Sequence, residues 1–305
     1  MFRMEEINNK NVTRIEFEIL RAMIESEKPL SQRALGRIVD KSPATVNRIM
    51  KDLESRGLLA GAKVTEEAAA VMEQFRARRA IFIAAGFGHR MMPITLNTPK
   101  PLVRVNGVMI IETMLDAVIA AGIEEIYIVR GYLADRFDML LSRYPQIRFF
   151  DNPDYNEANN ITSAMLVKDL FSNAYVLEGD LLLKNPGLIT KYQYSCNYLG
   201  IYTDRTDDWC LEVKNRQVTA MKQGGINCYQ MVGISYWNEQ AGRRLAEDIP
   251  KAFEMPGGPE QFWDDVPLKF FRDRYHVEIR PCTREDVTEV DTFKELKAID
   301  SSYGM

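Results

Sequence analysis

The sequence of 305 residues predicts an α/β protein in which a mostly parallel, Rossmann-like sheet follows a small, mainly α-helical domain. Three observations lead to this fold class. Helical periodicity dominates the first eighty residues, strand-like and helix-like segments alternate from residue 80 onward, and a glycine-containing loop directly follows the first of those strands. A chain of this length exceeds the usual size of one domain, so we expect two, spanning 1–79 and 80–305.

Composition excludes several functional classes. Hydrophobic residues make up 46% of the chain and charged residues 27%, as in an ordinary globular protein. No apolar run approaches the roughly 18 residues that a membrane span needs, and the first residues lack the apolar core of a secretory signal. The presence of only two histidines argues against a histidine-based metal site or triad. The four cysteines are widely separated, which predicts free thiols and a cytoplasmic protein.

The first three helices have recognisable boundary residues. Helical spacing of apolar residues begins near Val12 and ends near Lys28. Ser31 can cap a second helix, 32–39, and Ser42 followed by proline opens a third that ends at Gly57. The residues expected to face the core are Ile15, Ile19, Leu20, Met23, Ile24, Leu35, Ile38, Val46, Ile49, Met50 and Leu53.

A short helix, a tight turn and a capped helix with polar outward residues resemble a bacterial winged helix-turn-helix domain. Residues 58–64 would form a short wing, and a charged helix would run from Thr65 to Arg79. Residues 1–80 carry a formal charge of +3 and the remainder −7, which permits nucleic-acid contact. The resemblance implies DNA as a partner; a docking or dimerisation module is the alternative. The expected DNA-facing residues are Thr45, Asn47, Arg48 and Lys51.

A glycine loop follows the strand-like run 80–85 and predicts a site for a nucleoside triphosphate. Gly86 and Gly88 allow backbone N–H groups to approach phosphate oxygens closely. Arg90 offers a planar fork of donors for phosphate, and Lys100 adds a compact positive charge. The loop is not a Walker A loop, because no Gly-Lys-Ser/Thr follows, and it lacks the third glycine of the dinucleotide fingerprint.

The remainder alternates helices and strands. We expect helices over 110–121, 133–144 and 162–170, and strands over 125–130, 148–151 and 174–178. Repeated βα units imply parallel strands with helices on both faces. Ligands in such sheets lie at the carboxyl ends of the strands, where the glycine loop and Asp180 would be.

Two aspartates end strand-like segments. Asp180 follows 174–178, and Asp291 ends the alternating segment 287–290. Because carboxylate oxygens suit Mg²⁺, which neutralises a triphosphate, we expect Asp180 and Asp291 to hold one Mg²⁺. The alternative for Asp291 is that it caps a helix starting at Thr292.

From residue 80 to about 300, the chain resembles the bacterial CTP:phosphocholine cytidylyltransferases of the sugar-phosphate nucleotidyltransferase superfamily. The segments that carry the resemblance are 86–100, 129–132, 155–163, 178–180, 232–237, 262–264 and 289–291. It implies a nucleotidyltransferase fold, Mg²⁺ as cofactor and CTP as donor. The nucleotide-binding residues that it implies are Ala85, Gly86, Gly88, Arg90, Asn159, Asn160 and Ser163.

Acceptor recognition is expected in a less regular insert after Asp180. A quaternary ammonium cannot donate hydrogen bonds, so aromatic faces and a nearby carboxylate hold it. The resemblance places such a pocket at Trp209, Phe262, Trp263 and Asp264. It implies phosphocholine as the acceptor. Phosphoethanolamine and 2-aminoethylphosphonate stay open, because aromatic rings and carboxylates can also bind a primary amine.

The implied reaction is attack of an acceptor phosphate oxygen on the α-phosphorus of CTP, with loss of pyrophosphate. Arg90 would grip the β- and γ-phosphates, and Lys100 would orient the acceptor phosphate. CTP or UTP as donor and the oligomeric state stay open at this point. The rival from another class is a transcriptional regulator whose nucleotidyltransferase-like domain only senses CTP or a choline metabolite.

Overall fold

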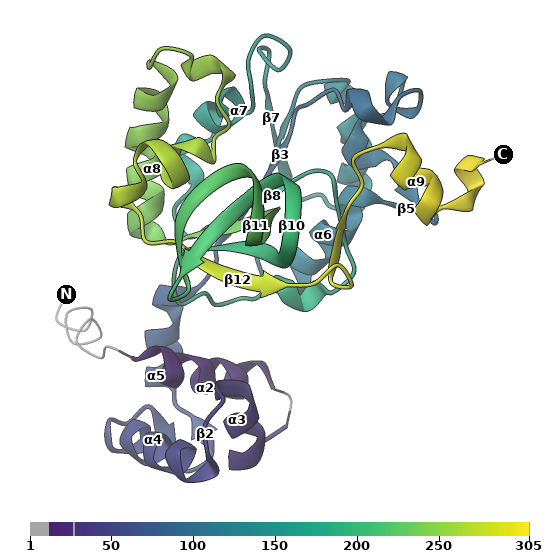
Figure 1. The fold of residues 1–305 in the computed structure, drawn as a ribbon. Coiled ribbons are helices and arrows are strands. Elements are labelled where there is room, and N and C mark those ends of the chain that lie inside the picture. Colours follow the sequence, from purple (N-terminus) through teal and green to yellow (C-terminus); the bar gives the residue numbers. More distant parts are fainter. Residues whose placement is uncertain (1–11, 27, 305) are drawn as a thin grey trace. The chain divides into compact units, whose positions relative to one another are not determined.

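The computed structural model describes residues 12–26 and 28–304 (Figure 1). The chain divides into two compact units, Met1–Arg76 and Ala77–Met305. No helix in the described part of the chain is long and apolar enough to cross a membrane.

The N-terminal unit consists of α2 (Arg14–Glu25), α3 (Gln32–Val39), α4 (Pro43–Ser55) and α5 (Glu66–Met72), with a two-stranded wing of β1 (Leu59–Ala60) and β2 (Lys63–Val64). A side-chain oxygen caps the first turn of each of these four helices. The capping residues are Thr13, Ser31, Ser42 and Thr65. The sequence therefore predicts where these helices begin.

The turn between α3 and α4 is tight. A Cβ on Gly36 would lie 2.6 Å from the Lys41 carbonyl oxygen, so only glycine allows this approach. Two expectations fail here. Ile38, expected in the core, is 47% exposed because α3 turns it outward. The expected helix 65–79 ends in a short 3₁₀ turn, Glu73–Phe75, after which the chain becomes extended.

The central sheet of the C-terminal unit has the strand order β10-β12-β11-β8-β3-β6-β7. Strands β8, β3, β6 and β7 are parallel, and β11 pairs antiparallel with β8. Their bounds are β3 Arg79–Ala84, β6 Glu125–Arg130, β7 Ile147–Asp151, β8 Ala174–Glu178, β10 Asn197–Lys214, β11 Gln217–Trp237 and β12 Glu278–Cys282. The mostly parallel Rossmann-like sheet is confirmed.

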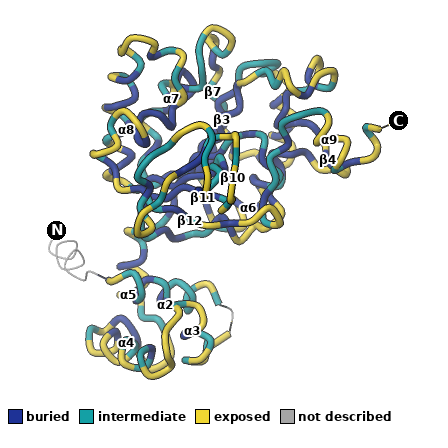
Figure 2. The backbone as a smooth tube through the Cα atoms, viewed as in Figure 1, coloured by how far each residue is buried: buried dark blue, intermediate teal, exposed yellow. Residues whose placement is uncertain are grey.

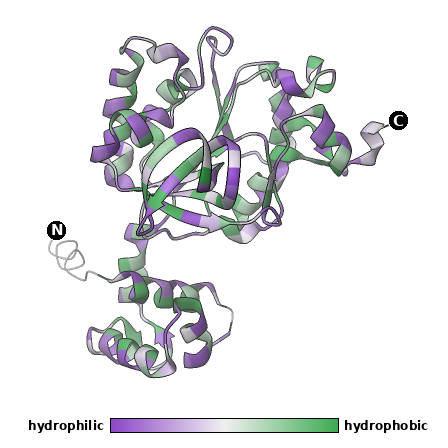
Figure 3. Cartoon of the chain, viewed as in Figure 1, coloured by the Kyte–Doolittle hydropathy of each residue, from purple (hydrophilic) through white to green (hydrophobic). Residues whose placement is uncertain are grey.

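Both faces of the sheet are covered by helices (Figures 1 and 2). Successive residues of β3 alternate between two cores, with Phe82 in one and Ile81 in the other. Helix α6 (Ile110–Ala120) packs on the first face, and α7 (Ile161–Leu166) and α8 (Glu239–Phe253) pack on the second. The amphipathic helices accordingly alternate hydrophilic and hydrophobic residues along their turns (Figure 3).

Helix 110–121 and the three short strands 125–130, 148–151 and 174–178 form within one residue of the predicted limits. The expected helix 133–144 is instead a run of 3₁₀ turns, Ala134–Ser142, entered through Leu133 in the left-handed conformation. The expected helix 162–170 ends early at Leu166 and continues as a 3₁₀ turn, Lys168–Leu170. Short helices depend mainly on packing, which local pattern does not report.

The insert after Asp180 is not irregular. It forms the long antiparallel hairpin β10–β11, whose two-residue turn has Asn215 and Arg216 at positive φ. Register shifts bend the hairpin back on itself, so that Cys210 is paired with both Lys222 and Gln230. The expectation of a less regular acceptor region was therefore wrong for Trp209, because this hairpin forms one wall of the cavity described below, but it holds for Phe262 and Asp264, which lie among short turns.

Smaller elements complete the unit. Strand β9 (Leu181–Leu183) pairs antiparallel with β13 (Val287–Glu289), and β4 (Arg104–Val105) with β5 (Val108–Met109). Helix α9 (Phe293–Ile299) follows β13.

Candidate active site

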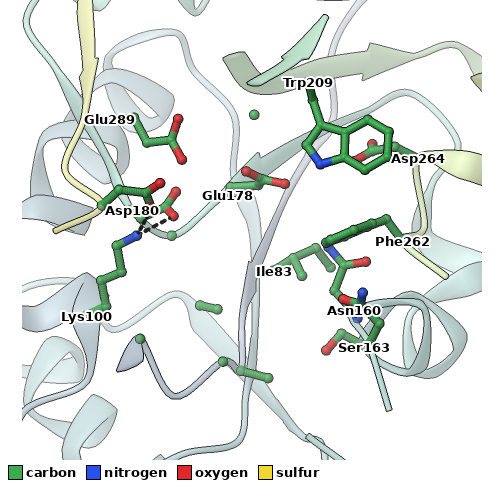
Figure 4. A pocket seen from close by; sticks show the side chains of 18 of the residues that line it. Ile83, Lys100, Asn160, Ser163, Glu178, Asp180, Trp209, Phe262, Asp264 and Glu289 are labelled. Atoms are coloured by element: carbon green, nitrogen blue, oxygen red, sulfur yellow. Dashed lines mark hydrogen bonds and ion pairs between the residues drawn. The ribbon is translucent and has the colours of Figure 1, made fainter. Parts of the chain in front are cut away.

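A cavity of about 510 Å³ opens at the carboxyl ends of β3 and β8, as expected for ligands of an α/β sheet. It has three chemically different regions (Figure 4). Carboxylates and Lys100 lie at one end, amide and hydroxyl groups at a second, and aromatic rings with further carboxylates at a third. We call them the acid cluster (Asp180, Glu289 and Asp291), the amide end (Asn152, Asn159, Asn160 and Ser163) and the aromatic end (Trp209, Phe262 and Asp264).

The glycine loop leaves β3 and lines the cavity with Ala85, Gly86 and Gly88. Nothing lies within 4 Å of where a Cβ of Gly86 would be, so the backbone there is open to a ligand. Gly88 has φ +71°, and a Cβ on it would be 3.1 Å from Lys100 Cβ. Glycine is therefore required at 88 by backbone conformation and by the close passage of Lys100.

The acid cluster forms because two strands pair beside the end of β8. Asp180 directly precedes β9, and antiparallel β13 places Glu289 opposite Leu181. The Val290 N–H also donates to the Asp180 carbonyl oxygen at 3.1 Å. Ligand oxygens of Asp180, Glu289 and Asp291 consequently lie within 4.8 Å of one another. Asp291 does not cap α9; Thr292 does.

Lys100 and Arg90 neutralise part of this acid cluster. Lys100 Nζ lies 2.8 Å from Asp180 Oδ2 and 2.5 Å from Asp291 Oδ1. Burial lowers the pKa of Lys100, but the two carboxylates outweigh it and leave that pKa raised. The largely exposed Arg90 reaches Asp291 Oδ2 at 2.8 Å. Both bases predicted to bind phosphate are thus held next to the predicted metal ligands.

The acid cluster fits a divalent cation. Three carboxylates converge, as oxygen-preferring ions require. Asp180 Oδ1 is buried and has no hydrogen-bond partner in the described chain, so this oxygen is available to bind a cation. Burial, then the charges of Asp180 and Asp291, raise the pKa of Glu289 to about 8 in the metal-free protein. Glu289 therefore keeps its proton near neutral pH in the metal-free protein, and a bound cation would displace that proton.

The amide end is built by the turn after β7 and by the start of α7. Asn159, Asn160, Ser163 and Asn152 all line the cavity. The Asn159 side chain forms hydrogen bonds within the protein: its Nδ2 donates to the Glu260 carbonyl oxygen, and its Oδ1 accepts from the Asn160 N–H. Asn160 Oδ1 accepts the Trp263 N–H at 2.8 Å. The Asn160 Nδ2 group and the Ser163 hydroxyl are the groups left to meet a ligand.

At the aromatic end, Trp209 from the hairpin meets Phe262 edge to face, with ring centroids 5.8 Å apart. The buried Asp264 accepts a hydrogen bond from Tyr198 Oη at 3.1 Å. Burial raises the pKa of Asp264 to about 7, although that hydrogen bond opposes the shift. Three of the four residues predicted for the acceptor pocket are therefore together.

Trp263 is the exception. Its ring is 1% exposed, packs against Phe171 and Trp237, and does not line the cavity. Phe262 and Asp264, on either side of it in the sequence, both line the cavity, whereas the Trp263 side chain belongs to the hydrophobic core. The expectation that Trp263 forms part of an ammonium cage was wrong.

Glu178 lies between the acid cluster and the aromatic end (Figure 4). Gly233 of β11 makes room for it, because a Cβ there would be 2.4 Å from Glu178 Oε2. Burial, then the charges of Asp180 and Asp264, hold the pKa of Glu178 well above its ordinary value. Its carboxylate accepts no hydrogen bond from any described residue.

Sequence reasoning did not assign several polar residues that line the cavity, among them Asn152, Glu178, Tyr198, Asp208 and Glu289. Two had an available indication. Glu289 and Asp291 are two apart in an extended segment and so point to the same side. Asn152 directly follows β7, at the ligand-binding edge of the sheet. Tyr198 and Asp208 lie on the hairpin, whose course the sequence does not predict.

In the N-terminal unit, α4 presents the four residues predicted to face DNA. Arg48 and Lys51 are exposed, and Thr45 and Asn47 are half-buried. Thr45 Oγ1 also shares a hydrogen bond of 2.9 Å with the capping Ser42 hydroxyl.

Two family models match the chain. A Nucleotidyl transferase model matches residues 79–194, and a Winged helix-turn-helix DNA-binding model matches residues 13–60. Together with the sheet and the loop-and-carboxylate site, these matches define the C-terminal unit as a nucleotidyltransferase and the N-terminal unit as a winged helix-turn-helix domain.

Similarity to individual proteins narrows the class from nucleotidyltransferases to cytidylyltransferases. A 2-aminoethylphosphonate cytidylyltransferase of Lancefieldella rimae is 34% identical over 73% of this chain and 92% of its own. A choline-phosphate cytidylyltransferase of Streptococcus pneumoniae is 30% identical over 73% and 96%. The solved CTP:phosphocholine cytidylyltransferase of S. pneumoniae superposes with a TM-score of 0.68 and 26% identity, covering 74% of this chain and 99% of that one. The chain belongs to the bacterial cytidylyltransferases.

Proposed function

We propose that this enzyme transfers CMP from CTP to 2-aminoethylphosphonate, a short phosphorus acid with a primary amine. The observation that carries the acceptor assignment is the surplus of carboxylates at the aromatic end of the cavity and between that end and the acid cluster. Glu178, Asp264 and Asp208 all line the cavity beside Trp209 and Phe262. A relative that is 34% identical is a cytidylyltransferase for that same acceptor.

Hydrogen-bond chemistry favours a primary amine. An ammonium group brings three N–H donors, whereas a trimethylammonium group brings none. Buried carboxylates are stabilised by donors and by positive charge together. The Glu178 carboxylate has no donor from the described residues, so an acceptor that supplies one gains more than an acceptor that does not.

The acid cluster would hold Mg²⁺ through Asp180, Glu289 and Asp291. When bound, the ion supplies neutralisation of phosphate charge. The Gly86 and Gly88 backbone would line the triphosphate, with Arg90 at the β- and γ-phosphates. Lys100 is the cation closest to the carboxylates, and it would turn toward the α-phosphate and the incoming phosphonate.

In the reaction, a phosphonate oxygen forms a bond to the α-phosphorus while the bond to the bridging oxygen of the β-phosphate breaks. Pyrophosphate leaves with that oxygen and its electron pair. The attacking phosphonate is already ionised near neutral pH, so no general base is required. Catalysis then consists of positioning and charge stabilisation by Lys100 and Arg90.

Phosphocholine is the second candidate acceptor. The edge-to-face pair of Trp209 and Phe262 offers aromatic surface of the kind that attracts a quaternary ammonium. The S. pneumoniae relative is a choline-phosphate cytidylyltransferase. With Trp263 in the core, however, the aromatic end has fewer rings than the sequence suggests.

An acceptor panel tests the assignment. Pyrophosphate release from CTP should be measured with 2-aminoethylphosphonate, phosphoethanolamine, phosphocholine and sugar 1-phosphates. We expect the highest kcat/KM with 2-aminoethylphosphonate. Glu178→Gln should raise KM for the amine acceptors roughly tenfold to a hundredfold through loss of a charged hydrogen bond, with KM for CTP unchanged. Asp207→Asn, which alters an exposed neighbouring carboxylate, is the control. A preference for phosphocholine in the wild type would contradict the proposal.

The N-terminal unit supports a separate proposal, binding of duplex DNA through α4. The supporting observation is its outer face, where Arg48 and Lys51 are exposed beside polar Asn47. We expect the double variant Arg48→Glu/Lys51→Glu to lose DNA affinity in a fluorescence-anisotropy titration at low salt. Arg243→Glu, an exposed change in the C-terminal unit, should bind as the wild type does. No binding of DNA by the wild type would leave this unit a docking module.

A further inference from the structure

The amide end contains a side-chain arrangement that fixes the direction of one hydroxyl. Asn152 is 3% exposed and is tied to the sheet by its backbone N–H, which donates to the Arg130 carbonyl oxygen at 2.8 Å. Its Oδ1 accepts the Asp154 N–H at 3.0 Å. A backbone N–H is only a donor, so the oxygen of the Asn152 amide must face Asp154 and the nitrogen must face the other way.

The two protons of Asn152 Nδ2 are directed at two hydroxyls. Thr162 Oγ1 and Ser163 Oγ each lie 3.0 Å from this nitrogen. The Thr162 hydroxyl donates its own hydrogen bond to the Asn159 carbonyl oxygen at 2.9 Å. Ser163 Oγ must likewise accept from Asn152, so its own proton points away from the amide.

No described residue accepts the Ser163 proton, and Ser163 lines the cavity. The Asn159 carbonyl oxygen, one turn back in the chain, already accepts from Thr162. In Figure 4 the Ser163 hydroxyl lies at the cavity edge near Asn160. The Ser163 hydroxyl is therefore presented to the cavity as a hydrogen-bond donor.

The neutral amide end suits a nucleobase better than the other two regions do. The acid cluster demands cations, and the aromatic end has the carboxylates that an ammonium needs. A base edge instead requires neutral donors and acceptors, which Asn160 and Ser163 supply. This placement rests on the proposed cytidylyl transfer.

We infer that Asn152 is a positioning residue that selects cytosine over uracil by holding the Ser163 hydroxyl as a donor. Ring atom N3 of cytosine carries a lone pair and accepts a hydrogen bond. N3 of uracil carries a proton, which Ser163 could accept only with its remaining lone pair, and the Ser163 proton would then have no acceptor among the described residues. The discrimination comes from an unpaired buried group, which makes it larger than a difference in fit.

Asn152→Asp tests the inference because it replaces the Nδ2 donor with an acceptor of the same size. The Asp154 N–H would still donate to one carboxylate oxygen, while the other would take the Ser163 proton. Ser163 would then present lone pairs to the cavity. We expect the ratio of kcat/KM for CTP to that for UTP to fall roughly tenfold to a hundredfold, mainly through KM.

A double-mutant cycle separates this role from a structural one. Ser163→Ala should also lower the CTP:UTP ratio, and Asn152→Asp should change that ratio no further when Ser163 is already alanine. Thr162→Val removes the other hydroxyl bonded to Asn152. It should lower the melting temperature and leave the CTP:UTP ratio unchanged. Dissociation constants of CTP and UTP from calorimetry should follow the same order.

The outcomes are distinct. An unchanged ratio in Asn152→Asp, or equal losses with CTP and UTP, overturns the inference. Should Asn152→Asp not fold, Ser163→Ala alone decides, because an unchanged ratio there is equally contradictory. A wild type that transfers no nucleotidyl group to any acceptor overturns the proposed function instead.

Discussion

Lys100 is the residue on which the charge of the site depends. Its ammonium bridges Asp180 and Asp291, the same carboxylates proposed to hold the metal. Before nucleotide binds, it supplies part of the positive charge that those carboxylates need. When the nucleotide binds, its phosphate oxygens become a second partner for the positive charge of Lys100. The lysine and the metal therefore compete for the carboxylates in the free enzyme and act together in the complex.

Removing that charge should separate the two roles. Lys100→Met is expected to bind Mn²⁺ more tightly than the wild type in the absence of nucleotide, because two carboxylates lose their counter-ion. Its kcat should fall at least about a hundredfold through lost charge stabilisation. Calorimetric titration with Mn²⁺ measures the first effect. Lys168→Met, which breaks only an exposed pair with Asp169, is the control. Weaker Mn²⁺ binding by Lys100→Met would contradict the competition.

Asp264 gives a dependence of stability on pH. Its pKa in the folded protein is about 7, against an ordinary value of 3.8. Between these values the folded state keeps a proton that the unfolded chain has lost. The free energy of unfolding therefore falls as pH rises through this window, by up to about 1.4 kcal/mol per pH unit from this group.

Asp264→Asn removes that titration while keeping an oxygen for the Tyr198 hydroxyl. Its melting temperature should decline less than that of the wild type between pH 5 and 7, by up to roughly 3–5 °C per pH unit. The measurement is thermal unfolding of the C-terminal unit without nucleotide or divalent ions. Parallel pH profiles for variant and wild type would show that Asp264 does not keep its proton in the folded state.

The β10–β11 hairpin is the element that shapes acceptor recognition. It brings Asp208 and Trp209 from one strand and Gly233 from the other to the cavity wall. Gly233 lies beside Glu178 so closely that any side chain would displace the carboxylate. An element distant in sequence from the glycine loop thereby sets the space around the proposed amine site.

Gly233→Ala should consequently raise KM for 2-aminoethylphosphonate several-fold, because the added methyl group displaces Glu178. KM for CTP should change little. Steady-state kinetics with each substrate varied in turn measures the split. Gly304→Ala adds a methyl group where nothing lies within 4 Å and serves as control. Equal increases in both KM values would place Glu178 outside acceptor recognition.

The elements differ in how far the sequence predicts them. The capped helices of the N-terminal unit and the buried strands next to the glycine loop are predicted, because caps and period are local properties. The hairpin is not, since its turn at Asn215 and Arg216 lacks the usual glycine and its bends come from register shifts. The prediction for Trp263 fails for a similar reason, because whether a tryptophan packs into the core depends on the fold around it.

At the scale of the whole molecule, the chain joins a cytidylyltransferase to a winged helix-turn-helix domain. We propose that the domains span 1–79 and 80–305. The rival role of a pure sensor needs nucleotide binding without turnover. Retention of the glycine loop, Lys100 and three converging carboxylates in one cavity instead supports catalysis.

The most direct test is identification of the product by ³¹P NMR after incubating the full-length enzyme with CTP, Mg²⁺ and 2-aminoethylphosphonate. Cytidylyl transfer predicts equal amounts of pyrophosphate and of a new anhydride that joins a phosphonate to a phosphate. Asp180→Asn should form neither. Free CMP with an unchanged phosphonate signal, or no turnover with any acceptor, would contradict the account.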